Sequence, residues 1–304
     1  MRALASPASL KGVLSAREAA ARLAEGLRRG GAEVEDLPIA DGGEGTAEAL
    51  RARVRRRLVV PDAFGQPREA PIRELADGSA VVEAAETIPL DPGRLDPIAA
   101  SSRGLGELIA AVEAPRLLVC LGGTATVDGG AGLLEVLREL PAPTTVLCDA
   151  LVPLRDAARR FAPQKGAMPE QVDLLERRLL SMPDLAPYAE LAGAGAAGGL
   201  GAALALLGGE LVPGAEEVLR RLDFRAHVGR ADLVVTGEGR VDETTTAGKA
   251  PGEALRVCRE EGVRCVVFGG RVDLELAGAE MVALSGDPAR AAADLVTLGQ
   301  RLSR

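Results

Sequence analysis

The chain has 304 residues, a length typical of about two domains, and 47% of its residues are hydrophobic, enough for packed cores. Its 36 Lys and Arg against 44 Asp and Glu give a net charge of −8, which excludes a general surface for nucleic acid or anionic membranes. No stretch approaches the roughly 18 uninterrupted apolar residues of a membrane span, and the first residues are too broken for a signal peptide. We therefore expect a cytoplasmic protein with small-molecule partners, as a monomer or a homodimer.

The cysteines and the single histidine narrow the chemistry. The four cysteines show no C-x-x-C spacing, and Cys120 and Cys148 lie in apolar, strand-like runs, where we expect buried, unreactive thiols. Because His227 is the only histidine, a histidine metal cluster is impossible, and we expect this residue at the surface or at a helix end. The groups that remain available for catalysis are carboxylates, lysines, arginines, hydroxyls and backbone amides. Such groups suit phosphoryl transfer, which depends mostly on positioning and charge neutralisation.

The first fifty residues predict alternating strands and helices. Residues 2–7 form a short strand, and Ser15 with Glu18 makes an S-x-x-E capping box at the start of a helix. Gly30 and Gly31 stop that helix, and "EVEDLPI" is the next strand. The loop "ADGGEGT" then begins another helix, which we expect to end in the basic run "RARVRRR".

The predicted secondary structure changes at residue 58. Short alternating segments over 58–86 indicate an antiparallel meander, followed by a helix over 101–114 and a buried strand over 116–123. A glycine-rich turn with a helix follows over 126–140. Residues 163–224 are mostly helical by their pattern, and the last eighty return to strand, helix and strand. The two chain ends thus predict one open α/β sheet, residues 1–57 with 225–304, and residues 58–224 an inserted mixed α/β domain.

Three segments combine glycines with acids after an apolar strand: 40–46, 126–132 and 236–242. In open α/β sheets, ligands bind beyond the carboxyl ends of the strands, where these turns should lie. Each acid taken alone is explained by a helix cap. Three such turns in one chain favour a shared site, in which the carboxylates hold Mg²⁺ beside phosphate or accept hydrogen bonds from substrate hydroxyls.

A fourth glycine-rich segment, 193–199, matches G-x-G-x-x-G. The dinucleotide fingerprint needs a strand directly before it, and "PDLAPYAEL" is a poor strand. The segment either binds phosphate through free amides or permits close helix packing. The lysines Lys11, Lys165 and Lys249 each stand beside a glycine, where they are either phosphate-binding cations or solvated surface groups. No P-loop sequence is present.

The motifs occur in an order that resembles the type 1 (bacterial) glycerate kinases. The blocks that carry the resemblance are "SLKGVLSAREAA", "ADGGEGT", "SSRGLGELI", "LGGTATVDGGAG", "FAPQKGA", "GAGAAGGLGAAL" and "TGEGRVDETTTAGKAP". The resemblance implies ATP-dependent phosphorylation of D-glycerate, with 2-phosphoglycerate as the usual product. It also implies a flavodoxin-like (Rossmann-like) domain built from both chain ends, an inserted second domain, and an active site in the cleft between them.

The chain departs from the family pattern at four positions. Ala8 stands where the family usually has Asp, Val127 and Val152 replace Asn, and Ala247 replaces a common His. The segment after "GGAGLLEVL" is also shorter. Retention of the acids and lysines favours an active kinase. The alternatives are a non-catalytic or altered-specificity member that binds a small hydroxy acid and, from G-x-G-x-x-G, an NAD-dependent oxidoreductase.

The expected site draws on the retained groups, with ATP and Mg²⁺ as cofactors. We expect catalytic roles for Asp41, Asp128, Asp149, Lys165 and Lys249. Substrate binding is expected of Lys11, Glu44 and Arg103, and nucleotide binding of Gly193, Gly195, Gly198, Gly199 and Glu238. The expected metal ligands are Asp41, Asp128 and Asp242.

Overall fold

The computed structural model describes all residues from 1 to 304, and the chain forms two compact units. Unit 1 contains Met1–Asp41, Glu48–Leu50 and Ala215–Arg304, and unit 2 contains Gly42–Ala47 and Arg51–Gly214. The boundaries expected from sequence, at 57/58 and 224/225, therefore lie later in the chain than those between the units. Residues 53–57 belong to unit 2 because they form the first part of a strand of its sheet.

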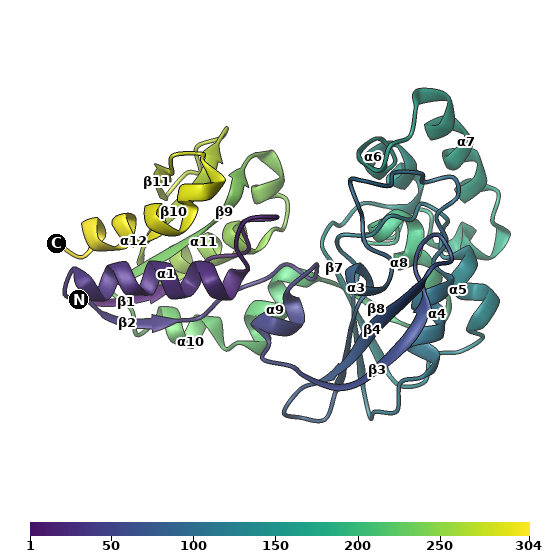
Figure 1. Cartoon of the computed structure of the whole chain (residues 1–304), viewed down its shortest axis with the longest axis horizontal. Coiled ribbons are helices and arrows are strands. Elements are labelled where there is room, and N and C mark those ends of the chain that lie inside the picture. Colours follow the sequence, from purple (N-terminus) through teal and green to yellow (C-terminus); the bar gives the residue numbers. More distant parts are fainter. The chain divides into compact units, whose positions relative to one another are not determined.

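Unit 1 is built on a five-stranded parallel sheet with the order β11-β10-β9-β1-β2. Counted along the chain, this is the flavodoxin-like order 2-1-3-4-5, so the predicted α/β class with an open sheet from both chain ends is confirmed (Figure 1). The strands are β1 (Arg2–Ala5), β2 (Glu33–Asp36), β9 (Leu233–Val241), β10 (Arg264–Val272) and β11 (Glu280–Ala283).

Helices cover both faces of this sheet. On one face, α1 (Ala16–Arg29) and α12 (Ala291–Leu302) bury a core that includes Leu23, Leu27 and Leu295. On the other face lie α9 (Gly214–Arg221), α10 (Phe224–Val228) and α11 (Ala250–Glu261), packed through a separate apolar cluster. The predicted capping box is present, since Glu18 N donates to Ser15 Oγ at 3.2 Å and Ser15 N donates to the Glu18 carboxylate at 2.8 Å.

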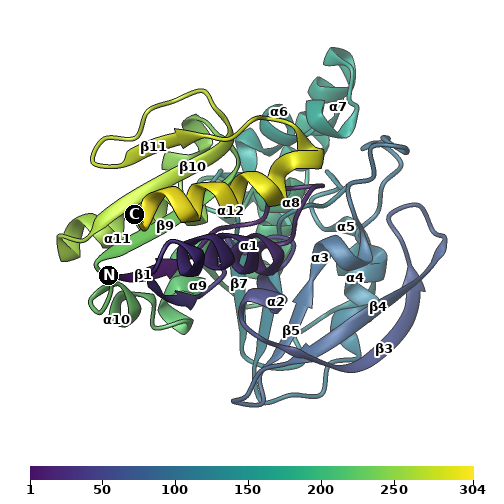
Figure 2. The ribbon, with the colours of Figure 1, turned by 60° about the vertical axis from the view of Figure 1, so that its left-hand side comes forward.

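Glycines let α1 and α12 lie side by side, as Figure 2 also shows. A Cβ built on Gly26 of α1 would lie 2.1 Å from the carbonyl oxygen of Val296, and one built on Gly299 of α12 would lie 2.6 Å from the carbonyl oxygen of Leu23. Both values are far inside van der Waals contact. The two helix backbones therefore touch directly, and neither position accepts a side chain without displacement of its neighbour.

Unit 2 is built on a six-stranded mixed sheet with the order β3-β4-β5-β6-β7-β8. The first three strands are antiparallel, as the predicted meander requires, and the pairs from β5 to β8 are parallel. The strands are β3 (Arg53–Pro61), β4 (Pro67–Glu74), β5 (Ala80–Glu83), β6 (Leu117–Cys120), β7 (Thr144–Cys148) and β8 (Glu210–Pro213). Because β5, β6 and β7 are parallel, their carboxyl ends share one edge.

The helices of unit 2 are short, and their apolar side chains are buried in two hydrophobic clusters. They are α3 (Ala84–Thr87), α4 (Arg103–Ala110), α5 (Ala131–Val136), α6 (Ala157–Phe161), α7 (Pro169–Leu180) and α8 (Ala196–Leu206). The 3-10 helices Pro163–Lys165 and Pro183–Tyr188 connect some of them. The predicted helical region thus exists, but it also contains the unpredicted strand β8.

Two local expectations are wrong. The helix expected to run to residue 57 is only α2 (Thr46–Ala49), because the basic run joins β3 and pairs with β4, where Arg55 meets Glu74 at 3.1 Å and Arg57 meets Glu69 at 3.0 Å. The segment 236–242 is not a turn either, since β9 continues to Val241. Eight residue pairs with β10 hold this strand extended through its glycines.

The expectations for the cysteines and the histidine fit the structure. All four cysteines are buried, no disulfide joins them, and burial raises the pKa of the Cys148 thiol to about 12. His227 lies in the last turn of α10, where its Nδ1 is 2.9 Å from the Glu35 carboxylate. None of the helices has the length and apolarity needed to cross a membrane.

The α1–α12 contact makes a prediction about stability. Gly26→Ala should lower the free energy of unfolding of unit 1 by about 1–3 kcal/mol, because the added methyl group overpacks the helix crossing. The matched control is Gly229→Ala, where the nearest atom to a new Cβ is 3.6 Å away and the backbone is helical. Urea unfolding of both variants measures the difference. Equal stability of the two variants would contradict the direct backbone contact.

Candidate active site

In unit 1, the loop after β1 lies beside the carboxyl half of β9. A Cβ built on Gly239 would lie 3.6 Å from the backbone nitrogen of Lys11, whose side chain is exposed. The strand order reverses between β1 and β9, and such a switch point is where ligands bind in open α/β sheets. The sequence candidates Lys11 and Glu238 therefore both lie at the expected binding edge of this sheet.

Glu238 is the buried acid of this edge. It is 9% exposed, its Oε1 accepts from Thr245 Oγ1 at 2.7 Å, and its Oε2 accepts from Lys249 Nζ at 3.3 Å. Burial raises the pKa of Glu238, the neighbouring Asp41 raises it further, and Lys249 opposes both. Asp41 and Lys249 thus both act on the charge of Glu238. We name these three residues the unit 1 cluster.

Asp242 follows β9 and caps the 3-10 helix Glu243–Thr246. Its Oδ1 accepts from Thr244 N at 2.9 Å and from the Thr244 hydroxyl, while Arg240 Nε lies 3.6 Å from Oδ2. The hydrogen bond from the Thr244 side chain is the main reason that the pKa of Asp242 is lowered. The carboxylate is thus ionised and fixed in direction, which suits either a cap or a cation ligand.

In unit 2, Lys165 is a buried ammonium group. It is 3% exposed and donates to Thr126 O at 2.7 Å and to Thr124 Oγ1 at 3.4 Å, with the Phe161 ring centroid 5.7 Å away. Burial lowers the pKa of Lys165 to about 8, while Asp149 and Asp128 act to raise it. We name Lys165, Asp128 and Asp149 the unit 2 cluster. Near neutral pH, Lys165 is charged but close to its titration range.

The Asp128 carboxylate fixes the turn after β6 by accepting hydrogen bonds. Its Oδ2 accepts from Ser102 N at 2.8 Å, Ser102 Oγ at 2.7 Å and Gly132 N at 3.2 Å, and its Oδ1 accepts from Gly130 N at 3.1 Å. Four donors occupy this carboxylate, so it joins the beginnings of α4 and α5. Ser102 was not anticipated from the sequence, although it lies in the motif "SSRGLGELI".

Asp149 comes directly after β7 and faces the backbone that follows β6. A Cβ built on Gly122 would lie 2.9 Å from Asp149 Oδ2 and 2.6 Å from Gly43 Cα. The carboxylate is half-buried and acts on the ammonium group of Lys165. Because Gly122 leaves room on that side, the ends of β6 and β7 and the segment 42–47 converge around this carboxylate.

The segment 42–47 carries the candidate Glu44 and is held by an acid that is not among the residues expected from the sequence. Glu83, the last residue of β5, accepts from Gly45 N at 3.2 Å and from Ala47 N at 2.6 Å. Glu44 itself is exposed, and its Cβ lies 4.0 Å from a Cβ built on Gly123. The only sequence signal for Glu83 is an acid at the end of a buried apolar strand.

The glycines of 193–199 are packed rather than open. The amide of Gly195 donates to Val152 O at 2.8 Å, and the amides of Gly198 and Gly199 both donate to Gly195 O at 3.1 Å. A Cβ on Gly198 would lie 2.2 Å from Thr126 O, and Gly129 N donates to Gly198 O at 3.0 Å. These contacts support the packing alternative over free phosphate-binding amides. A 3-10 helix precedes the segment, so the dinucleotide fingerprint lacks its strand.

Two further expectations meet competing contacts. Arg103 is exposed and pairs with Glu107 at 3.0 Å and Glu135 at 3.0 Å on α4 and α5, which does not favour a substrate role. No group of three or more His, Cys, Asp and Glu side chains that could hold a metal ion is formed, so Asp41, Asp128 and Asp242 do not make a ready-built site. Asp128 lies in unit 2, whereas the other two lie in unit 1.

The positions that depart from the family pattern are explained in part by their surroundings. Val127 is fully buried in the apolar cluster of α6, α7 and α8 with Leu154 and Leu175, so its side chain points into a core. Ala8 is half-buried against an apolar cluster of unit 1, and its amide donates to Gly237 O at 2.9 Å. Nothing in the structure explains Ala247.

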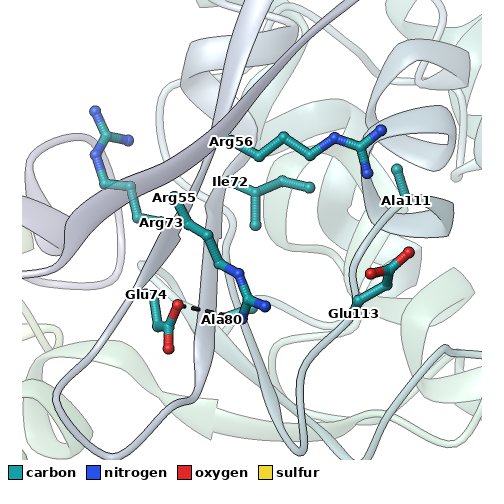
Figure 3. A pocket seen from close by; sticks show the side chains of 8 residues that line it. All are labelled: Arg55, Arg56, Ile72, Arg73, Glu74, Ala80, Ala111 and Glu113. Atoms are coloured by element: carbon teal, nitrogen blue, oxygen red, sulfur yellow. Dashed lines mark ion pairs between the residues drawn. The ribbon is translucent and has the colours of Figure 1, made fainter.

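A basic pocket in unit 2 is separate from these groups. It has a volume of about 40 Å³ and lies between β3, β4 and the end of α4 (Figure 3). Arg55 reaches across it to Glu74 at 3.1 Å. The full lining is Arg55, Arg56, Ile72, Arg73, Glu74, Ala80, Ala111 and Glu113. This volume has room for only a few water molecules.

Comparison with known proteins gives the family. The model of the glycerate kinase family matches residues 3–140 and 138–286. A glycerate kinase from Bacillus subtilis (strain 168) is 34% identical over 90% of this chain and 85% of that protein, and a glycerate 2-kinase from Escherichia coli (strain K12) is 35% identical over 83% and 80%. A crystal structure from Salmonella typhimurium LT2 that carries the name glycerate kinase 2 has a TM-score of 0.79 and 30% identity, with 100% of this chain and 97% of that chain covered. The chain therefore belongs to the glycerate kinase family.

Proposed function

We propose that this protein catalyses the ATP-dependent phosphorylation of D-glycerate to 2-phosphoglycerate, as a member of the type 1 bacterial branch. Support comes from the family match over most of the chain, from relatives named glycerate kinase and glycerate 2-kinase, and from the ordered type 1 motifs. The observation that carries the proposal is Lys165, a buried cation beside two carboxylates at the end of parallel strands. Such a group can neutralise a transferring phosphoryl group at neutral pH.

Lys165 is proposed to contact the phosphate oxygens of ATP. Its ammonium group has one firm acceptor, Thr126 O at 2.7 Å, and one long contact to Thr124 Oγ1 at 3.4 Å. A phosphate oxygen is a stronger acceptor for it than a threonine hydroxyl. Because Lys165 is buried, its charge is poorly screened and acts on a phosphate more strongly than a surface lysine does.

Asp149 is proposed to orient the reacting hydroxyl of glycerate and to take its proton. Asp128 is less suited to that role because four donors already occupy its carboxylate. We assign Asp128 the positioning of the turn that supplies Thr126 O to Lys165. Lys11, exposed and without an acid partner, is a better candidate than the ion-paired Arg103 for the glycerate carboxylate.

In the unit 1 cluster, Lys249 is proposed as a second phosphate-binding cation, and its hydrogen bond to Glu238 fixes the orientation of its ammonium group. The carboxylates of Asp41 and Asp242 suit Mg²⁺, which typically takes one or two carboxylates together with substrate phosphate oxygens rather than a complete protein cage. When bound, the ion would neutralise charge on the phosphates.

The protein would act on small-molecule substrates as a monomer or a homodimer, and in the cytoplasm, where its four thiols stay reduced. A second candidate function, a non-catalytic hydroxy-acid-binding protein, comes from the departures at Ala8, Val127, Val152 and Ala247. The burial of Val127 in a core weakens that argument, because this position then offers no group to a substrate.

A coupled assay of ADP release tests the function directly. With ATP, Mg²⁺ and D-glycerate, the purified protein should turn over, and NMR of the product phosphate should identify 2-phosphoglycerate. A flat trace with D-glycerate, tartronate and close hydroxy acids would support the binding protein instead. Calorimetry with NAD(H) separately tests the oxidoreductase alternative, for which we expect no heat of binding.

Removal of the Lys165 charge should reduce kcat by about 10³-fold or more, as for other charge-stabilising groups in phosphoryl transfer. Since the pKa of Lys165 is lowered to about 8, kcat/KM for ATP should fall as the pH rises through about 8. Lys165→Met tests the first expectation. Lys165→Arg stays protonated and should retain partial activity without that alkaline decline. A decline unchanged in Lys165→Arg would assign it to another group.

Asp41 and Asp128 should respond differently to replacement by Asn. Asp41→Asn should lower kcat by about 10²-fold or more with little change in stability, since it removes a proposed metal ligand. Asp128→Asn puts an amide group opposite four donors and should lower the free energy of unfolding by about 1–3 kcal/mol. Kinetics and urea unfolding of both variants test this contrast. Equal stability loss, or near-normal turnover in Asp41→Asn, would contradict the assignment.

A further inference from the structure

We propose that Glu83 is a positioning residue that fixes the segment 42–47 and thereby holds Glu44 in place for the glycerate substrate. The proposal rests on the function proposed above and adds to it a residue that takes no part in the motifs. Glu83 lies at the end of β5, 39 positions after Glu44 in the sequence, and it reaches the segment only because the fold brings the two together.

The contact is a two-point clamp on backbone amides. The two carboxylate oxygens of Glu83 are used separately, Oε1 for Ala47 N at 2.6 Å and Oε2 for Gly45 N at 3.2 Å. Glu44 lies immediately before this clamp. On its other side, Gly42 is packed against Leu147 and Gly214, where a Cβ would lie 3.0 Å from each. The Glu44 side chain is therefore presented between two anchored points of the backbone.

The backbone at the Glu83 end depends on a flexible glycine. Gly45 has φ +86° with no atom within 4 Å of a Cβ built on it. Further hydrogen bonds of this stretch run from Thr46 Oγ1 and N to Gly43 O and from Ala52 N to Ala47 O at 2.8 Å, and none of them holds the Gly45 amide. A glycine in the left-handed region is easily reordered when its amide is released. Loss of the clamp should thus free the backbone next to Glu44 without disturbing the sheet.

Glutamate at this position is costly to stability, which argues for a role beyond packing. Glu83 is 4% exposed, and burial raises its pKa to about 7. The charged groups that face it are Glu86 of α3, which raises the pKa, and Arg73 of β4, which lowers it; Cys120 of β6 is its register neighbour. Arg73 Nη2 itself donates to Glu86 at 2.7 Å. A buried glutamine would avoid this cost, but it offers only one acceptor for the two amides.

Hydrogen exchange tests the clamp independently of activity. In Glu83→Gln, peptides that cover 42–49 should exchange at least about 10-fold faster than in the wild type, while peptides from β6, β7 and α8 stay unchanged. Glu48→Gln is the matched control, since Glu48 is an exposed acid covered by the same peptides but outside the segment 42–47. Unchanged exchange over 42–49 in Glu83→Gln would overturn the proposal whatever the enzyme does.

A double-mutant cycle tests the link to the substrate. Glu83→Gln and Glu44→Gln should each raise KM for D-glycerate by about 10-fold with a smaller change in kcat, and the double variant should be no worse than either alone. Fully additive effects would overturn the link through Glu44. A wild-type protein that turns over no hydroxy acid would instead contradict the proposed function, and the exchange result would still stand.

A stability control separates loosening of the segment from misfolding. A raised pKa in the folded state means that Glu83 stabilises the protein below about pH 4.5 and that this contribution is lost as the pH rises through about 7. At pH 8, Glu83→Gln should therefore be as stable as the wild type or more stable. A large stability loss at pH 8, together with exchange raised throughout unit 2, would assign Glu83 a merely structural role and overturn the proposal.

Discussion

Burial of charged groups at the carboxyl edges of parallel strands is the constraint on which much of this structure depends. An ammonium or carboxylate group inside a protein must be met by oriented partners, or it loses its charge. In unit 2, Lys165 has the carbonyl oxygen of Thr126 and the field of two acids. In unit 1, Glu238 has Thr245 and Lys249. Each buried charge is therefore tied to a particular backbone conformation.

The turn after β6 shows how far that requirement extends. Thr126 O reaches Lys165 only if the turn 124–130 is held, and Asp128 holds it through four hydrogen bonds from Ser102, Gly130 and Gly132. This turn also packs directly against α8. A side chain at Gly198 would clash with Thr126 O, so the glycine permits the contact. Two motifs about seventy residues apart in the sequence therefore pack together and jointly fix the turn that contacts Lys165. They are the glycine-rich motif 193–199 and the acidic motif 126–132.

Several features could be predicted because their causes are local. The capping box at Ser15, the meander of β3 to β5 and the helices after the glycine-rich turns follow from spacing and side-chain type within a few residues. The sequence also singled out Lys165 and Glu238 as candidate groups. The basic run 51–57 is predicted as the end of a helix, but residues 53–57 pair with β4, a contact that lies outside the local sequence pattern.

By itself, the sequence determined the α/β class, the open sheet shared by the chain ends, the family resemblance and the kinds of groups available for chemistry. Only the tertiary structure decided what those groups contact. It turned the amides of 193–199 inward, filled the carboxylate of Asp128 with donors, placed Val127 in a core and brought Glu83 to the amides of Gly45 and Ala47. The physical reason is that hydrogen bonding and burial join residues far apart in the chain, and residue spacing carries no record of such contacts.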